Sequence, residues 1–423
     1  MKCKFLLLFF IVLSSESYGQ SLQECIQMAE QNYPLIRKYN LIDQTSSLTV
    51  SSIQKDWLPQ VTASAQATLQ SDVTAWPDEM RTMLASSGLD VKGLKKDQYR
   101  IGIDMVQTVY DGGIIQARKD IALLEAETDK AQTTVDLYAV RQRVIELYFS
   151  ALLIEEQTNM QKNLLDYLKA NESKLESMHQ NGTASLSDFN TVRAERLDVE
   201  QQIENLLSQA ATCKTLLSML CGQEVSNTEK PQYADVVGTG RRPELDYIDS
   251  FIRLLDAKER LINSSLLPKV SVFATGFYGY PGYNMFEDMI HHKWSLNGMI
   301  GMRFTWNIGS LYTVKSDRAK IHQQISMAEN NRDVFLFNNR IEQIQRHSNI
   351  ERFQRIMKLD DEIISLRSSI RKASESKLDH GIIEVSELVK DLKNENNAML
   401  QKSIHEIEYL KELAKLNFTT NNK

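Results

Sequence analysis

Cysteine, proline and glycine are scarce in this chain, whose 423 residues include 4 Cys, 7 Pro and 17 Gly. Four cysteines at this length exclude a disulfide-rich scaffold, and no pair has the Cys-x-x-Cys spacing of zinc or redox sites. The small number of helix breakers favours long, uninterrupted helices. An excess of positive charge is also lacking, because the formal net charge is −6, so a nucleic-acid partner is not expected.

Long apolar runs are missing as well, apart from one at the N-terminus. Residues 1–4 are basic, residues 5–13 are all apolar, and Ser17 and Gly19 are small residues where a signal peptidase reads them. We therefore predict a signal peptide at 1–19 and export of the remaining chain. The apolar run is shorter than an ordinary transmembrane helix, and a short membrane anchor or a buried helix is the alternative.

Cleavage before Gln20 leaves three cysteines, Cys25, Cys213 and Cys221. Cys213 and Cys221 lie on one predicted helix, about 12 Å apart by helix rise. This distance is too long for a disulfide between them.

The chain contains an internal duplication. Three short segments of its first half recur in the same order in its second half, which chance similarity does not readily explain. We predict a first structural repeat at 20–228 and a second at 243–418, joined by a stretch that contains Pro and Gly. The matched segments are 57–61 with 266–270, 107–113 with 303–310, and 181–189 with 380–388.

Each predicted repeat holds two segments in which apolar and polar residues alternate. Period two over about 12 residues indicates β-strands that are long for a soluble protein and suit tilted transmembrane strands. Aromatic residues gather near the segment ends, as rings do at a membrane–water interface. A soluble β-sandwich with one wet face is the alternative. The predicted strands are about 59–70, 98–110, 268–280 and 294–306.

The number of strands has a consequence for assembly. Four strands are too few to close a membrane barrel, and an open strand edge is not tolerated in lipid. Bacterial barrels begin at about eight strands. We therefore expect several copies of the chain to combine their strands.

Long helical segments follow the strands in both repeats, over 114–220 and 311–418; the first helix of each pair is predicted to end at 180 or 379, and the second to begin at 183 or 382. Each is broken once by a glycine, Gly182 or Gly381, which suits the left-handed turn at the tip of a helical hairpin. Apolar residues repeat along these helices at coiled-coil spacing, and we interpret the stripes as packing seams. Shorter helices are predicted over 22–56, interrupted by Pro34, and over 244–266.

Several motifs occur in both repeats. They are Leu-Pro-x-Val at strand starts (58–61 and 267–270), Tyr-Asp-x-Gly and Trp-Asn-x-Gly at strand exits (110–113 and 306–309), and an acidic residue six positions after each tip glycine. Together with the helix end at 216–222, they resemble the TolC-like outer membrane efflux protein family, the outer membrane factors of tripartite efflux and type I secretion systems. The resemblance covers essentially the whole mature length.

This resemblance implies a mainly α fold with a membrane β-barrel portion. A homotrimer would form a 12-stranded β-barrel, four strands from each chain, that continues into a long coiled-coil α-barrel. The β-barrel would lie in the lipid of the bacterial outer membrane, and the helical barrel in the periplasm. The implied partners are a periplasmic adaptor (membrane fusion) protein and an inner-membrane transporter of the RND or ABC type.

Charged residues on the polar strand faces would project into the lumen of such a barrel. In the family, acidic residues six and nine positions after the tip glycine narrow the periplasmic aperture. Thr191 and Lys390 depart from that acidic pattern, and Glu387 and Lys390 are spaced to form an ion pair on one helix face. The lumen candidates are Arg100, Asp104, Lys269 and Arg303, and the aperture candidates are Asp188, Thr191, Glu387 and Lys390.

The hairpin tips are the candidate docking sites for the adaptor. Their glycines allow close approach of another backbone, and their neighbours offer small and apolar contacts. Packing within the chain is the alternative role for these residues, and interaction with the helix dipole is the alternative for Asp188. The docking candidates are Gly182, Ser185, Leu186, Gly381, Val385 and Leu388.

Enzyme signatures are missing. The sequence has no nucleotide-binding, serine-hydrolase or zinc-protease motif, and the pair His291-His292 has no third ligand at metal-binding spacing, so no enzyme, cofactor or metal site is expected. We predict the outer-membrane exit duct of a tripartite pump, a passive channel for small molecules. The alternatives are a type I protein secretion duct and, from another class, a secreted coiled-coil scaffold or adhesin. The loop at 71–97, with a short helix expected at 77–84, would plug or cover the barrel.

Overall fold

The computed structural model describes residues 20–232 and 240–421. The predicted signal peptide, 1–19, and part of the predicted junction between the repeats, 233–239, lie outside the described residues. The chain divides into two compact units, which we call the hairpin unit and the sheet unit. The hairpin unit is Met1–Tyr39, Ala131–Asp246 and Arg332–Lys423, and the sheet unit is Asn40–Lys130 and Tyr247–Asn331.

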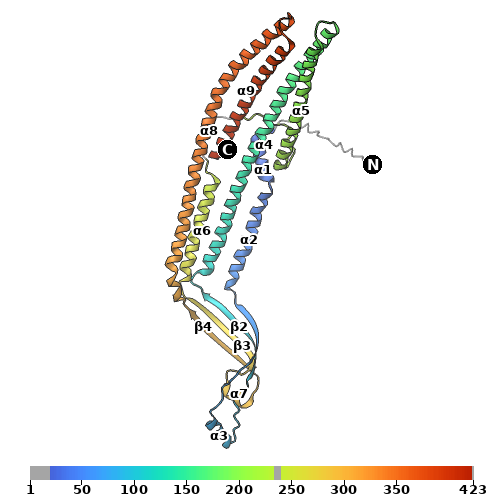
Figure 1. The fold of residues 1–423 in the computed structure, drawn as a ribbon. Helices are drawn as coiled ribbons and strands as arrows, with labels where there is room; N and C mark the ends of the chain where they lie inside the picture. Colours follow the sequence, from blue (N-terminus) through green and yellow to red (C-terminus); the bar gives the residue numbers. More distant parts are fainter. Residues whose placement is uncertain (1–19, 233–239, 422–423) are drawn as a thin grey trace, which may run out of the picture. The chain divides into compact units, whose positions relative to one another are not determined.

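Two antiparallel helical hairpins make up most of the hairpin unit (Figure 1). Helices α4 and α5 form one hairpin, and α8 and α9 form the other. The predicted ends at residues 180 and 379 are confirmed, but α5 and α9 begin three residues later than expected. No helix among the described residues has an apolar stretch long enough to cross a bilayer. The bounds are α1 Leu22–Asn32, α4 Ile114–Gln180, α5 Leu186–Cys221, α8 Val314–Asp379 and α9 Val385–Thr420.

The hairpin tips explain the later helix starts. Gly182 and Gly381 adopt φ values of 76° and 69°, a left-handed conformation that ends the preceding helix. Before α5, the Ser185 hydroxyl accepts from the Asp188 backbone N–H at 3.1 Å, while the Asp188 carboxylate accepts from the Ser185 N–H. This capping box sets the first residue of α5 at Leu186.

The core of the hairpin unit gathers side chains from α1, α4, α5 and α9. Its largest members, among them Tyr148, Leu217 and Ile407, are fully buried. The Tyr148 hydroxyl accepts from the Glu229 backbone N–H at 3.0 Å, so the one polar atom of this side chain is satisfied. The predicted packing seam on α4, which includes Val144, is therefore covered within the chain.

The sheet unit contains one antiparallel sheet of four strands in the order β1-β2-β3-β4. The strands are β1 Gln60–Leu69, β2 Asp97–Tyr110, β3 Lys269–Tyr280 and β4 Ser295–Thr305, each within about one residue of its predicted bounds. Strands β2 and β3 pair directly, Ile103 opposite Gly276, and so join the two β-hairpins into one surface. Within the described residues, β1 and β4 each pair on one side only, so the sheet is open at both edges.

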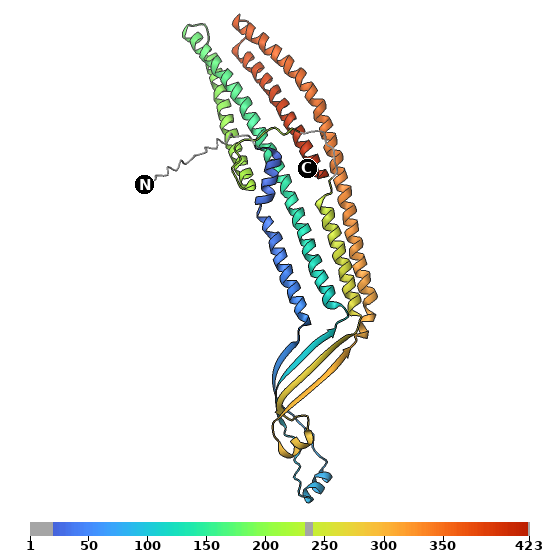
Figure 2. The ribbon, with the colours of Figure 1, turned by 180° about the vertical axis from the view of Figure 1, so that it is seen from behind.

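Helices and turns flank the strands of the sheet unit (Figure 2). The short helix expected at 77–84 is present as α3, whereas α7 was not predicted; an Asn284 side chain caps it. The remaining elements are α2 Arg37–Gln54, α3 Asp78–Ser86, α6 Pro243–Ser265, α7 Met285–His291, and the 3₁₀ turns η1 Pro34–Ile36, η2 Lys55–Trp57 and η3 Ile308–Tyr312.

Candidate functional site

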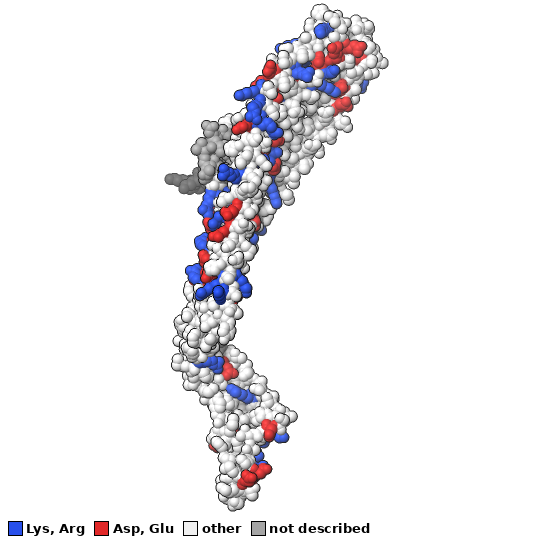
Figure 3. Space-filling view, turned by 60° about the vertical axis from the view of Figure 1, so that its left-hand side comes forward, with Lys and Arg blue, Asp and Glu red and all other residues white. Residues whose placement is uncertain are grey.

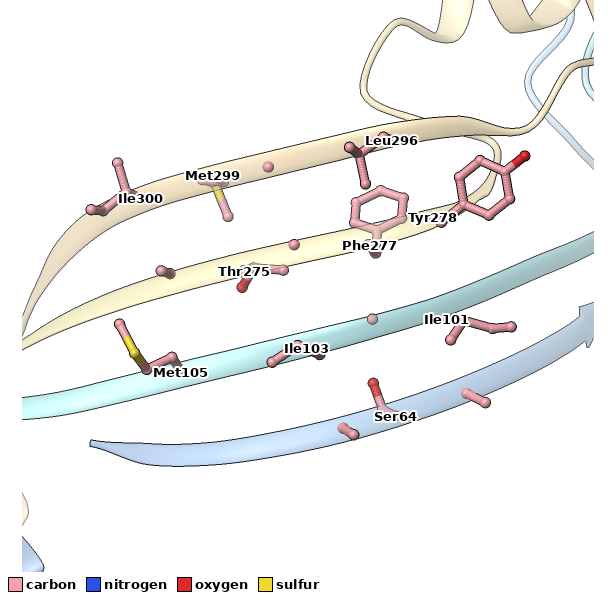
Figure 4. Close-up of a pocket in the computed structure, with 16 residues that line it drawn as sticks. Ser64, Ile101, Ile103, Met105, Thr275, Phe277, Tyr278, Leu296, Met299 and Ile300 are labelled. Atoms are coloured by element: carbon pink, nitrogen blue, oxygen red, sulfur yellow. The ribbon is translucent and has the colours of Figure 1, made fainter. Parts of the chain in front are cut away.

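The strand register separates the sheet into an apolar and a polar face. One apolar row runs across all four strands through Val61, Met105, Ala274 and Ile300. A shallow hollow of about 1050 Å³ lies on the sheet, lined largely by such apolar side chains (Figure 4). Large side chains on this face are open to solvent in the single chain, with Ile300 78% exposed. Contiguous exposed apolar surface of this kind is the mark of a membrane or protein contact.

The polar face carries all four residues that the sequence suggested for a lumen. Arg100 and Asp104 alternate along β2, and the register places Lys269 and Arg303 on the same side. The Thr275 hydroxyl donates to the Asp104 carboxylate at 2.7 Å. The structure thus brings three positive charges, and a carboxylate that accepts a hydrogen bond from a hydroxyl, to one polar surface.

Two phenylalanines on the polar face escaped the sequence analysis. The Arg100 guanidinium lies 4.0 Å from the centre of the Phe277 ring, and that of Arg303 lies 5.0 Å from the centre of the Phe273 ring. Cation–π contacts of this kind hold an arginine against the wall while it keeps its charge. Phe273 and Phe277 occupy odd-numbered positions of β3, whereas the residues of its apolar face occupy even-numbered positions. This alternation could have indicated that both rings lie on the polar face.

Aromatic rings mark both ends of the strands. Tyr99 stacks on Trp294 at a centroid distance of 5.9 Å near the loops, and Tyr110 and Trp306 lie at the helix ends of their strands. The 11 residue steps from Tyr99 to Tyr110 span roughly 36 Å along a strand. At the usual barrel tilt of 35–45°, this corresponds to roughly 25–30 Å along the membrane normal, close to the height of an outer-membrane apolar band.

Tyr280 differs from the other aromatic residues at the strand ends. It is buried among Val91, Leu94 and Met289 in a small core under the loops, and its hydroxyl accepts from the Lys95 backbone N–H at 2.9 Å. The same loop region holds His292, whose Nε2 is 2.7 Å from the Gly93 carbonyl oxygen. These contacts tie the first loop to the second, and the Tyr280 ring is buried, unlike those of Tyr99 and Trp294 at the neighbouring strand ends.

The aperture candidates lie beside the hairpin tips. Asp188 acts in the capping box of α5, which fits its alternative role at a helix start, and the Thr191 hydroxyl donates to the Ser187 carbonyl at 2.9 Å. Glu387 and Lys390 are both exposed on α9. No ion pair joins these two described side chains, so the spacing alone did not produce one.

The docking candidates divide into exposed and buried residues. Val385 and Leu388 are buried at 5% and 3% exposure, and Val385 belongs to a core shared by both hairpins. Leu186 projects into solvent at the tip. A cavity of about 330 Å³ lies between the two hairpins, lined by side chains that include Met178, Leu378 and Val385. The two tips therefore form one packed surface.

A second apolar surface follows helix α8. Four residues at alternating spacings of four and three fall on one side of this helix, and each is 45–59% exposed. On the face drawn in Figure 3, charged side chains are plentiful over the helices and sparse over the strands. The exposed residues of the α8 seam are Leu359, Ile363, Leu366 and Ile370.

An open sheet with an apolar face, joined in sequence to long helical hairpins, defines the class of outer-membrane channel subunits. Residues 25–223 match the family model described as "Outer membrane efflux protein". The resemblance predicted from the sequence is confirmed. No curated protein matches the chain by sequence.

Solved structures extend the likeness to the whole fold. The chain is similar to the outer-membrane channel OprN, with a TM-score of 0.69, 13% identity and coverage of 95% of this chain and 90% of that one. For VceC of Vibrio cholerae the TM-score is 0.67 and the identity 12%, with coverage of 94% of this chain and 95% of that one. For the CmeC outer membrane channel of Campylobacter jejuni the TM-score is 0.64 and the identity 13%, with coverage of 95% of this chain and 85% of that one. At these identities the likeness establishes the fold, including that of the second repeat.

Proposed function

We propose that three copies of this chain form the outer-membrane exit duct of a tripartite efflux pump. One observation carries the proposal: the four-stranded sheet is open at β1 and β4 and exposes an apolar face. Lipid does not tolerate free strand edges, so β4 of one copy pairs with β1 of the next until the barrel closes. Two copies would supply eight strands, the number in the smallest bacterial barrels, whereas the resemblance to the family favours three copies and 12 strands.

The α8 seam supports assembly through the helices as well. Its exposed residues at coiled-coil spacing require a partner helix, and no helix of the described chain covers them. A neighbouring copy supplies such a helix when the strands are paired edge to edge. The β-barrel and a helical barrel therefore form in the same assembly step, with the apolar strand face toward the outer-membrane lipid and the helices in the periplasm.

The polar strand face then lines a wet lumen. Arg100, Asp104, Lys269 and Arg303 place fixed charges along the path, and a passive duct needs no catalytic group. The tips form the periplasmic aperture, where Glu387 and Lys390 are the proposed constriction. The exposed part of the tips, around Gly182, is the proposed surface for the adaptor, which links the duct to an inner-membrane transporter of the RND or ABC type.

Planar-bilayer conductance of the detergent-extracted oligomer tests the duct and its wall. Because a lumen charge attracts counter-ions, Arg303→Gln should shift permeability toward cations, and Asp104→Asn should shift it toward anions. Each variant is a control for the other, because a general disturbance of the channel would shift the ion permeability of both variants in the same direction. Shifts in the same direction, or a soluble protein without channels, would overturn the proposal.

The aperture is tested with Glu387→Ala/Lys390→Ala in the same bilayers. We expect small wild-type conductance that rises in the double variant because side chains are removed from the narrowest point. Asp166→Ala/Lys169→Ala, an acid and a lysine with the same spacing on α4 but away from the tip, is the matched control. An unchanged conductance places the constriction elsewhere.

Small molecules are the proposed cargo, in keeping with the efflux description of the matching family. Cells that lack the chain should accumulate a dye that is an efflux substrate. The wild-type chain and the lumen and aperture variants described above should each restore export of the dye, at rates that differ between variants. Loss of a single secreted polypeptide with unchanged dye accumulation would instead favour a type I secretion duct.

A further inference from the structure

Two cysteines that are far apart in the sequence meet in the core of the hairpin unit. Cys25 lies on α1 and Cys221 is the last residue of α5, 196 positions away. Both are 0% exposed and belong to the same hydrophobic cluster. The Cys221 thiol donates to the Cys25 carbonyl oxygen at 3.6 Å. The sequence analysis compared only Cys213 with Cys221 and missed this pair.

Neighbouring contacts fix the position of α1 against the end of α5. The Asn32 amide donates to the Cys221 carbonyl at 2.7 Å, one residue before Gly222 ends the helix with a φ of 74°. On the other side of the pair, the Gln20 backbone N–H donates to the Asn227 carbonyl at 3.0 Å. With hydrogen bonds on both sides, α1 is held against the end of α5 at the level of the two cysteines.

We propose that Cys25 and Cys221 form a disulfide in the exported protein, linking α1 to the end of the first hairpin. The proposal rests on the proposed function only for the compartment, because export exposes the thiols to an oxidising environment. Cys213 lies more than two helical turns from Cys221 and stays a thiol. Three cysteines thus give one disulfide and one free thiol rather than an unpaired set.

The oxidant is the disulfide of an exported thiol–disulfide oxidoreductase. The Cys221 thiolate attacks one of its sulfurs, forming a mixed disulfide and releasing the other sulfur as a thiolate. The Cys25 thiolate then attacks the Cys221 sulfur, so that the Cys25–Cys221 bond forms and the mixed disulfide breaks. Two protons leave the chain's thiols, and two electrons reduce the oxidoreductase to its dithiol. Because both sulfurs are buried in the folded unit, the exchange takes place before α1 docks.

The two thiols differ in acidity in the folded unit. A hydrogen bond with Cys25 lowers the pKa of Cys221, although burial opposes the effect. The same hydrogen bond, followed by burial, raises the pKa of Cys25. In the folded unit, Cys221 is therefore the more readily ionised of the two thiols.

Such a bond would matter because it closes a long loop of the unfolded chain. Closing a loop of this length removes conformational entropy from the unfolded state and so favours the folded one. We expect the oxidised protein to unfold at a temperature higher by at least about 5 °C than the same protein with reduced thiols. The Cys25→Ser variant should show no such difference between oxidised and reduced samples.

The test uses the full-length chain extracted from outer membranes after acid quenching and alkylation with N-ethylmaleimide. We expect non-reducing digestion and mass spectrometry to give a peptide that joins Cys25 to Cys221, with alkylation only at Cys213. A Cys213→Ser variant, the matched control, should keep the link. Alkylation of Cys25 and Cys221 in the wild type, also after refolding with oxidised glutathione, overturns the proposal, as does a link to Cys213.

This readout on the wild-type protein does not depend on whether a cysteine variant folds. Conductance of the same preparation separates the two proposals. Channels from a protein with three alkylated cysteines overturn the disulfide and keep the duct. A linked protein that forms no channels keeps the disulfide and overturns the duct.

Discussion

Truncation of Arg242 should destabilise the hairpin unit more than any neighbouring charge removal. This side chain is only 8% exposed. It donates to both carboxylate oxygens of Glu244, at 2.9 and 2.5 Å, and to the Phe418 carbonyl oxygen at 3.1 Å. It therefore connects the start of the second repeat to the end of α9.

The magnitude follows from what the truncation leaves behind. The guanidinium lies 4.7 Å from the centre of the Tyr138 ring and 4.8 Å from that of Phe418. Arg242→Ala removes these contacts and leaves the Glu244 carboxylate without its donor, while the Phe418 carbonyl still accepts from the Tyr138 hydroxyl and the Asn421 N–H. Removing one partner of a buried pair costs about 3–5 kcal/mol, and the partial exposure of Glu244 places this case near the lower end.

Arg241→Ala is the matched control for this prediction. Arg241 pairs with Asp246 at 2.5 Å, but both side chains are more than half exposed, so the loss should be below about 1 kcal/mol. Urea unfolding of the detergent-solubilised protein, at equal protein concentrations, measures both variants. Arg242→Lys keeps the charge but not the forked donor, and should fall between the two. Equal losses in Arg242→Ala and Arg241→Ala would refute the reasoning.

Three further predictions concern charge, membrane contact and the hairpin turn. Burial raises the pKa of Glu146, but the Lys415 and Lys411 ammonium groups at 2.6 and 3.3 Å outweigh this, and the net pKa is lowered; Glu146→Gln should lower the urea midpoint at pH 7, and the difference should vanish as the pH falls through the lowered folded pKa. Ile300→Arg, on the apolar face, should cost about 2–4 kcal/mol of membrane stability and reduce assembled trimer in heat-modifiability gels, whereas Thr62→Arg on the polar face should not. Gly182→Ala should cost about 1 kcal/mol in thermal unfolding from backbone strain alone, because nothing lies within 4 Å of the added Cβ; an unchanged midpoint would contradict this.

Short-range sequence patterns predicted the strands and helix ends whose positions depend on neighbouring residues alone. Alternation with period two located β1 to β4, since one-residue slips would move every apolar side chain to the wrong face. The glycines at the tips located the ends of α4 and α8 because only a left-handed residue ends a helix in that way. The start of α5 was displaced, since the Ser185 capping box competes with the helical pattern and was not recognised. Helix α7 is too short for a periodic pattern to reveal it.

Contacts between distant residues were beyond these patterns. Cys25 meets Cys221 only because α1 packs against the end of α5, and nothing near either residue indicates the other. The same holds for Arg242, whose aromatic partners come from three helices far apart in sequence. The Glu387 and Lys390 spacing predicted an ion pair that did not form, because side chains on an exposed helix face gain little from pairing in water.

The two coiled-coil seams show what an apolar stripe does and does not specify. Val144 on α4 and Ile363 on α8 both lie in stripes of helical spacing, and the sequence treats them alike. In the chain, Val144 is completely buried while Ile363 is 46% exposed. Apolar periodicity thus predicts that a helix face packs against another helix, but not whether that helix belongs to the same chain. The uncovered α8 seam and the open edges of β1 and β4 both require a partner from outside the described chain, and the proposed assembly of identical copies would supply one to each.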